Sequence, residues 1–174
     1  MDTTQDLLII SASNGENLKL ATRFLQRAEK QEIGVELIDL TELSLPLFNP
    51  RTHAQDAITA EIDVLSKKLR SAPRWVICAP EYNGSIPPVL TSVIAWLSTE
   101  SDDFRSLFNG RPIALASFSG GGCMELLLSM RIQFTHLGAQ VVGRQLASNS
   151  QKQASEESID DLLKRIMQMK PLKL

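Results

Sequence analysis

Four short apolar segments divide the chain, and each is about as long as one β-strand. They are residues 7–10, 35–38, 75–78 and 113–116. The first, third and fourth are almost continuously apolar, which is typical of strands covered on both faces of a parallel sheet. The second alternates apolar and polar residues and therefore predicts an edge strand. A shorter candidate for a fifth strand lies at 141–142.

Helical periodicity fills the intervals between these segments. The first helical pattern covers 18–30 and places Leu18, Ala21, Leu25 and Ala28 on one face. The same spacing predicts further helices over 58–69, 89–97, 124–137 and 159–166.

Two of these helices carry further signals. In the fourth helix, Leu127, Leu128, Ile132 and either Phe134 or Thr135 are expected on the apolar face, and Gly138 is a natural stop. Ser155 is placed to cap the last helix.

Strands that alternate with helices predict an α/β fold. The expected architecture is a doubly wound, five-stranded parallel sheet with right-handed crossovers and helices on both faces. We see no internal repeat and no interdomain linker, so residues 1–174 are expected to form one domain.

The composition of the chain limits the classes of function that it can have. The chain has 174 residues, 43% of them apolar and 22% charged, with a net charge of −2. Because the chain has no excess of basic residues, it is not expected to bind nucleic acid.

No segment has the pattern of a secretory signal or a membrane span, so the expected location is cytoplasmic. Cys78 and Cys123 form no CxxC pair and are expected as buried thiols; no metal site is predicted.

In open α/β sheets, ligands bind beyond the carboxyl ends of the strands. The loop after the first strand, 11–17, is rich in small and hydroxyl-bearing residues. It leaves backbone amides open at a helix start, which attracts a phosphate. Ser11, Ser13 and Asn17 offer side-chain donors, with Lys19 nearby. An ordinary capped turn is the alternative, and neither a GxGxxG nor a P-loop motif is present.

The third strand is followed by a rigid, polar segment, 79–88. Tyr82 is the only tyrosine, and its ring is suited to flank a planar ligand. Asn83-Gly84 permits a turn with positive φ that exposes amides as far as Ser85. A rigid turn that introduces a helix at Pro87 or Pro88 is the alternative, and the two interpretations are compatible.

Three successive glycines follow the fourth strand, in the segment 117–122. Because glycines cost conformational entropy, the close approach of a ligand to the backbone is a good reason for them. A flexible loop before the next helix is the competing interpretation.

The segment 80–87, Pro-Glu-Tyr-Asn-Gly-Ser-Ile-Pro, followed by Trp96 and Ser98, resembles the NADPH-dependent FMN reductase family. This family includes related quinone, azo-dye and chromate reductases. The resemblance implies a flavodoxin-like fold with strand order 2-1-3-4-5. It also implies a bound flavin mononucleotide (FMN), with the phosphate at Ser11, Ser13, Asn14, Gly15 and Asn17. The ring would lie along Pro80, Glu81, Tyr82, Asn83, Gly84 and Ser85, bordered by Ser117, Ser119, Gly120 and Gly121.

The function implied by the resemblance is hydride transfer from NADPH or NADH through flavin N5 to a small acceptor, such as free flavin, a quinone or an azo compound. No side-chain acid or base is assigned, and His53 and His136 are interpreted as incidental. Family members commonly form dimers or tetramers, so a homodimer or homotetramer is expected. This chain departs from the family pattern in the first loop, where Asn14 stands near the usual arginine and Lys19 is the nearest cation.

Three other functions stay open at this stage. The chain can be an FMN-binding carrier or sensor without turnover of its own, or a diverged scaffold that no longer binds flavin. An electron-carrying flavodoxin fits less well, because segment 11–17 only partly resembles the hydroxyl-rich first loop of those proteins.

Overall fold

A computed structural model describes residues 5–51 and 56–173 and contains one parallel sheet. The strand order is 2-1-3-4-5, as expected, and every strand pair is parallel. The strands are β1 (Leu7–Ser11), β2 (Val35–Asp39), β3 (Trp75–Cys78), β4 (Pro112–Phe118), β5 (Gln140–Val141) and β6 (Leu146–Ser148).

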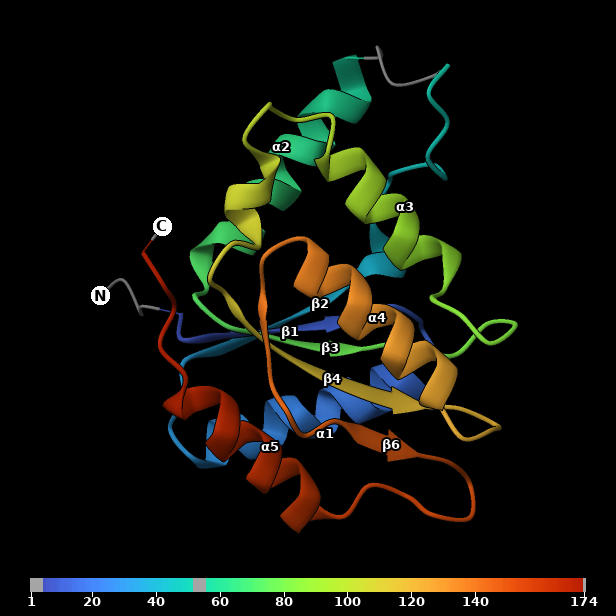
Figure 1. Cartoon of the computed structure of the whole chain (residues 1–174), viewed down its shortest axis with the longest axis vertical. Coiled ribbons are helices and arrows are strands. Elements are labelled where there is room, and N and C mark those ends of the chain that lie inside the picture. Colours follow the sequence, from blue (N-terminus) through green and yellow to red (C-terminus); the bar gives the residue numbers. More distant parts are fainter. Residues whose placement is uncertain (1–4, 52–55, 174) are drawn as a thin grey trace.

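Helices cover both faces of the sheet (Figure 1). One face carries α2 (Asp56–Ser71), α3 (Pro88–Leu97) and α4 (Met124–His136), and the other carries α1 (Glu16–Lys30) and α5 (Glu156–Gln168). Two short 3₁₀ turns, Leu40–Glu42 and Phe104–Leu107, complete the elements. The flavodoxin-like doubly wound arrangement predicted from the sequence is therefore confirmed.

The core has two layers because successive side chains of a strand point to opposite faces. Leu8 and Ile10 of β1 pack with α2, α3 and α4, whereas Leu7 and Ile9 pack with α1 and α5. All four side chains are at most 3% exposed. This double burial explains why the central strands are continuously apolar in sequence.

The predicted helix boundaries are largely confirmed. Ser155 caps α5 by accepting a hydrogen bond from the Ser158 backbone N–H, and Pro88 is the first residue of α3. Gly138 ends α4 at a φ of +95°, a conformation that glycine adopts without the strain imposed by a Cβ.

The expected inner faces of two helices are partly wrong. In α1, Ala21 and Ala28 are buried as expected. Leu18 and Leu25 are only half-buried, because Leu20 and Phe24 face the core instead. In α4, Leu128 and Ile132 are 53% and 63% exposed, and Leu126, Leu127, Met130 and Phe134 form the buried face. Because α4 is apolar on several sides, its sequence does not reveal which side is inward.

The sheet also has a sixth strand that the sequence did not predict. β5 pairs with the start of β4, and β6 pairs with its end. The segment 142–145 leaves the sheet between them, and its Val142 and Gly143 carbonyls accept hydrogen bonds from the Arg131 guanidinium. This edge of the sheet therefore consists of two short strands, β5 and β6, instead of one continuous strand.

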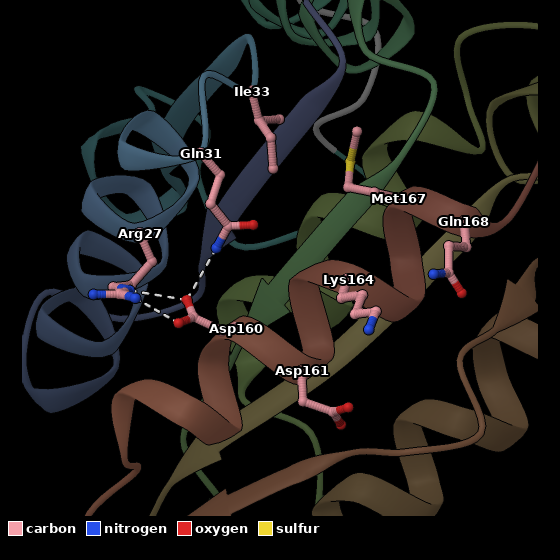
Figure 2. Close-up of a pocket in the computed structure, with 8 residues that line it drawn as sticks. All are labelled: Arg27, Gln31, Ile33, Asp160, Asp161, Lys164, Met167 and Gln168. Atoms are coloured by element: carbon pink, nitrogen blue, oxygen red, sulfur yellow. Dashed lines mark hydrogen bonds and ion pairs between the residues drawn. The ribbon is translucent and has the colours of Figure 1, made fainter.

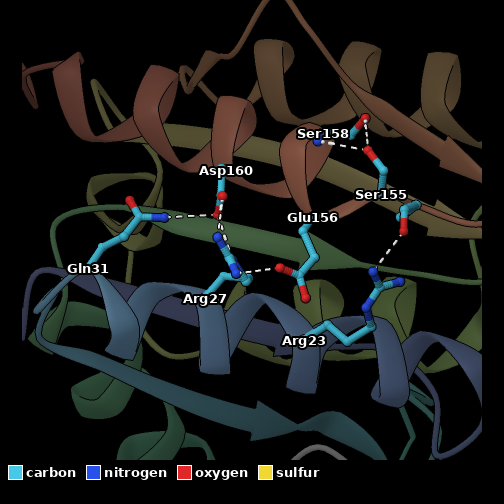
Figure 3. Close-up of polar contacts among 8 residues, drawn as sticks. Arg23, Arg27, Gln31, Ser155, Glu156, Ser158 and Asp160 are labelled. Carbon is cyan, nitrogen blue, oxygen red and sulfur yellow. Dashed lines mark hydrogen bonds and ion pairs between the residues drawn. The ribbon is translucent and has the colours of Figure 1, made fainter.

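Ion pairs fasten α1 to α5 on one face of the sheet (Figure 3). The Arg27 guanidinium binds both carboxylate oxygens of Asp160 and also contacts Glu156, at 2.5 Å. Gln31 donates to Asp160 from the next turn, at 3.0 Å. The hydrogen bonds from Arg27 hold the pKa of the Asp160 carboxyl below its ordinary value.

This depressed pKa predicts how stability depends on pH. The contribution of Asp160 is present above the pKa of an unfolded aspartate, about 4, and is lost as pH falls through the lower folded value. Urea unfolding at neutral pH and near pH 3 should therefore show a smaller acid-induced loss of stability in Asp160→Asn than in the wild type. The control, Asp63→Asn at an exposed position of α2, should keep the wild-type loss. Equal losses in all three proteins would contradict the assignment.

Both cysteines are buried and free, as expected. Burial raises the pKa of the Cys78 thiol, so this group stays protonated. Within the described ranges, we find no helix with the length and apolarity needed to span a membrane.

Candidate functional site

The loops after β1, β3 and β4 meet at the carboxyl edge of the sheet. They border an open cavity of about 360 Å³. Its lining residues are Ser13, Asn14, Gly15, Glu16, Asn17, Pro80, Glu81, Tyr82, Phe118, Ser119 and Gly120. Three segments that lie far apart in the sequence thus form one site, at the edge where doubly wound sheets bind ligands.

The first loop presents unpaired backbone donors at the start of α1. Among the residues that the structure describes, none accepts a hydrogen bond from the backbone N–H groups of Asn14, Glu16 and Asn17. Gly15 precedes the helix and supplies no side-chain cap. Open amides at the positive end of a helix dipole form an anion site.

The hydroxyl groups of this loop are used within the protein. Ser11 is fully buried, and its Oγ donates to the Ser13 carbonyl at 2.7 Å. The Ser13 Oγ accepts from the Gly15 N–H at 3.4 Å. These contacts use the Ser11 and Ser13 hydroxyl groups to hold the loop in shape.

Asn17 joins the first loop to the third. Its side-chain amide donates to the Phe118 carbonyl at 2.8 Å, and its Oδ1 accepts from the Phe118 N–H at 2.8 Å. The side chain is 2% exposed. The Asn17 side chain therefore forms hydrogen bonds with both the N–H and the C=O of a residue 101 positions away. These bonds set the distance between two walls of the cavity.

The loop after β3 ends in a two-residue turn. Tyr82 and Ser85 exchange backbone hydrogen bonds of 3.1 and 2.9 Å. Between them, Asn83 and Gly84 have φ values of 51° and 70°, the geometry of a type I′ turn. The predicted positive-φ turn is therefore confirmed, and it holds the Tyr82 side chain half exposed at the mouth of the cavity.

Glu81 connects this loop to α4. Its Oε2 accepts from the Leu126 N–H at 3.4 Å, in the first turn of a helix whose N-cap residue, Cys123, offers no side-chain cap. The positive end of the α4 dipole offsets the Glu81 charge there. Glu81 is thus a loop anchor whose other oxygen lies 3.8 Å from the position of a Cβ on Gly121.

The loop after β4 rests on a buried chain of hydroxyl groups. Ser117 Oγ donates to the Ala79 carbonyl at 2.7 Å, and Ser148 Oγ donates to the Ser117 carbonyl at 2.8 Å. Beyond this support, a Cβ added at Gly120 or Gly122 would meet no atom within 4 Å. The glycines therefore expose bare backbone to open space, as a close approach by a ligand requires.

The structure brings together nine of the residues predicted for the site: Ser13, Asn14, Gly15, Asn17, Pro80, Glu81, Tyr82, Ser119 and Gly120. Ser11 and Ser117 lie beneath the cavity as fully buried supports. Asn83, Gly84, Ser85 and Gly121 lie outside the lining. Glu16 and Phe118 line the cavity without having been predicted; their position next to predicted residues was the available signal.

A second hollow of about 360 Å³ lies on the other side of the first loop. It shares Ser13, Asn14 and Tyr82 with the cavity, and its remaining lining is mostly apolar: Ala12, Thr41, Leu47, Pro87, Pro88 and Val89. The Tyr82 ring therefore borders both spaces.

Other polar groups lie away from this edge. His136 is at the end of α4, where its carbonyl and ring contact Arg105, and His53 lies outside the described residues. In the part of the chain that the structure describes, no cluster of histidine, cysteine or acidic residues could hold a metal ion.

A wider, open hollow of about 630 Å³ lies between α1 and α5 (Figure 2). Three of its polar groups are paired with each other, since Arg27 and Gln31 both bind Asp160. It lies between two helices rather than at the carboxyl edge of the strands, so the cavity at the three loops is the better candidate.

Comparisons with known proteins agree with this geometry. The model of the family described as NADPH-dependent FMN reductase matches residues 6–153. The NADH:(hydroxy)cinnamate reductase subunit CrdA of Vibrio ruber is 29% identical over 116 residues, which are 66% of this chain and 54% of that protein. An FMN-dependent NADH:quinone oxidoreductase of a Marinomonas species is 33% identical, over 64% of each chain. The chain thus spans between half and two thirds of the length of these two relatives.

Solved structures agree on the fold. FerB of Paracoccus denitrificans, described as a flavoenzyme NAD(P)H:(acceptor) oxidoreductase, aligns with a TM-score of 0.73. The alignment covers 95% of this chain and 98% of FerB at 18% sequence identity. At that identity the likeness establishes the architecture alone.

Proposed function

This chain belongs to the NADPH-dependent FMN reductase family, and from that premise we propose that it is an FMN-dependent NAD(P)H oxidoreductase. Its flavin would lie in the cavity formed by the loops after β1, β3 and β4. The observation that carries the proposal is the set of unpaired backbone amides of Asn14, Glu16 and Asn17 at the wall of that cavity.

The residues present fit an FMN molecule. The amides at the start of α1 suit its phosphate, and the bare backbone around Gly120 suits close contact with a flat ring. Tyr82, half exposed at the mouth, would flank the ring. Among the remaining residues predicted for the site, Ser11 and Ser117 would act as buried supports. The exposed residues Asn83, Gly84, Ser85 and Gly121 would border the ring.

Flavin supplies the hydride chemistry between a reduced nicotinamide and an acceptor, and the protein supplies position and electrostatics. Asn17 and Glu81 hold the loops at a fixed separation through the Phe118 backbone and the start of α4. No side-chain acid or base is assigned. The more apolar hollow beyond Tyr82 is the proposed place for a small, planar, apolar acceptor.

The test is to add FMN to the purified protein without oxygen and then to add NADPH or NADH. The proposal predicts that bound flavin loses its visible absorbance and that an added quinone restores it. Bound flavin that neither nicotinamide reduces would indicate a carrier or sensor. Protein that takes up no FMN would indicate a diverged scaffold.

We also propose that the chain forms a single domain and acts in the cytoplasm as a homodimer or homotetramer. A single sheet that includes every described strand supports one domain. Free, buried thiols at Cys78 and Cys123 suit a reducing compartment. An apolar stripe on α4 supports self-association: Met124, Leu128 and Ile132 recur every fourth residue and are 53–63% exposed.

The stripe predicts the effect of a charge on assembly. Leu128→Glu should convert the oligomer to a monomer in sedimentation at micromolar concentration, because a buried, unpaired carboxylate opposes the interface. Val64→Glu introduces the same charge at an exposed apolar position of α2 and should leave the oligomer intact. A wild-type protein that sediments as a monomer, or a Leu128→Glu variant that remains assembled, would contradict the prediction.

A further inference from the structure

The candidate flavin cavity is lined by negatively charged side chains, which is unusual for a site that binds a phosphate. Among the described residues, its lining contains two carboxylates, Glu16 and Glu81, and no lysine or arginine. A phosphate monoester carries about 1.5 to 2 negative charges at neutral pH. Backbone amides and the α1 dipole must therefore bind the phosphate without the help of a cationic side chain.

Glu81 and Glu16 differ in what surrounds them. Glu81 is turned toward the start of α4, where its Oε2 accepts the Leu126 N–H. Glu16 is the first residue of α1, and one of the unpaired amides is its own. Its carboxylate therefore stands at the same positive helix end that the phosphate needs and competes for the same dipole.

The nearest cations are engaged with the protein. Lys19 Nζ lies 2.6 Å from Glu16 Oε1, and its side chain is 73% exposed. Arg23, one turn further along α1, donates to the Ala154 carbonyl at 2.7 Å. Both cations line a separate hollow of about 300 Å³ rather than the candidate flavin cavity, and Glu16 lies between the two spaces.

We propose that Glu16 is a specificity-determining residue that weakens binding of the flavin phosphate, so that the site exchanges its flavin and accepts riboflavin nearly as well as FMN. Lys19 offsets part of this repulsion through its ion pair with Glu16. The inference rests on the proposed function, since it concerns the flavin ligand of the same site.

The experiment measures the dissociation constants of FMN and riboflavin by calorimetry, since the two ligands differ only in the phosphate. In the wild type, FMN should bind less than about tenfold more tightly than riboflavin. Glu16→Gln should strengthen FMN binding by about three- to tenfold, because one like charge is removed from the phosphate site. Riboflavin binding should stay within about twofold of wild type, because riboflavin carries no charge there.

Glu29→Gln is the matched control. It makes the same change in net charge on the same helix, at an exposed position about 20 Å further along. That distance exceeds the screening length in physiological salt, about 8 Å, so both flavins should bind as they do to the wild type. Melting curves of both variants verify that the fold is retained.

Two results would overturn the inference while leaving the proposed function intact. One is FMN affinity that Glu16→Gln does not change, and the other is a wild-type preference for FMN over riboflavin of more than about tenfold, or 1.4 kcal/mol. Failure of the wild type to bind either flavin would overturn both the inference and the proposed function.

Discussion

Asn17→Leu is expected to lower the free energy of unfolding by about 2–4 kcal/mol and to weaken FMN binding by at least about tenfold. Leucine has a similar size but cannot replace the two hydrogen bonds to Phe118. The partly buried Phe118 N–H and C=O would then be left without their partner, at a cost of up to about 1–3 kcal/mol each. The cavity would also lose the contact that sets the distance between the loops after β1 and β4.

Urea unfolding and FMN titration measure the two effects. Gln26→Leu provides a control on the exposed side of the same helix and should change stability by less than about 0.5 kcal/mol. If Asn17→Leu were as stable as this control, Asn17 would not be the link between the two loops.

Gly120→Val is expected to weaken FMN binding by about a hundredfold, or 2.7 kcal/mol, while leaving the melting temperature of the apoprotein nearly unchanged. A Cβ at this position would meet no described protein atom within 4 Å, so the substitution should not strain the loop. It would occupy space at the wall of the cavity that a ligand needs. A large effect on binding without an effect on stability would distinguish this residue from Asn17.

Gly122→Val is the matched control. Its Cβ also meets nothing within 4 Å, but Gly122 does not line the cavity. Calorimetric titration with FMN should therefore give the wild-type dissociation constant. FMN affinity equal to wild type in Gly120→Val would place the flavin away from the loop after β4.

Much of the fold could be predicted from local patterns. The apolar segments at β1, β3 and β4 are continuous because both faces of the central strands are buried, and β2 alternates because it lies at the edge. The positive-φ turn at Asn83-Gly84 could be predicted because few residues tolerate that backbone conformation.

Features that depend on tertiary packing were not predictable in the same way. The apolar pattern of α4 assigned Leu128 and Ile132 to the core, although both are exposed. The interruption between β5 and β6 depends on Arg131, which lies on a helix outside the edge strand. No local signal in the sequence indicates either result.

The candidate site likewise has features that could be predicted from the sequence and features that could not. Proximity at the carboxyl edge followed from strand order, so the three loops could be assigned to one ligand. The hydrogen-bond partner of each side chain could not be predicted from the sequence. Asn17 resembled a phosphate donor in sequence, whereas in the structure its amide binds the Phe118 backbone. The amides of Asn14 and Glu16 carry no sequence signature, because every residue except proline has one.

The most direct test of the account is a crystal structure of this protein grown with FMN. We predict that the phosphate will lie within hydrogen-bonding distance of the backbone N–H groups of Asn14, Glu16 and Asn17, with the ring between Tyr82 and the backbone at Gly120. Flavin bound elsewhere, for instance in the hollow between α1 and α5, or a cavity closed by side chains in the presence of excess FMN, would contradict it.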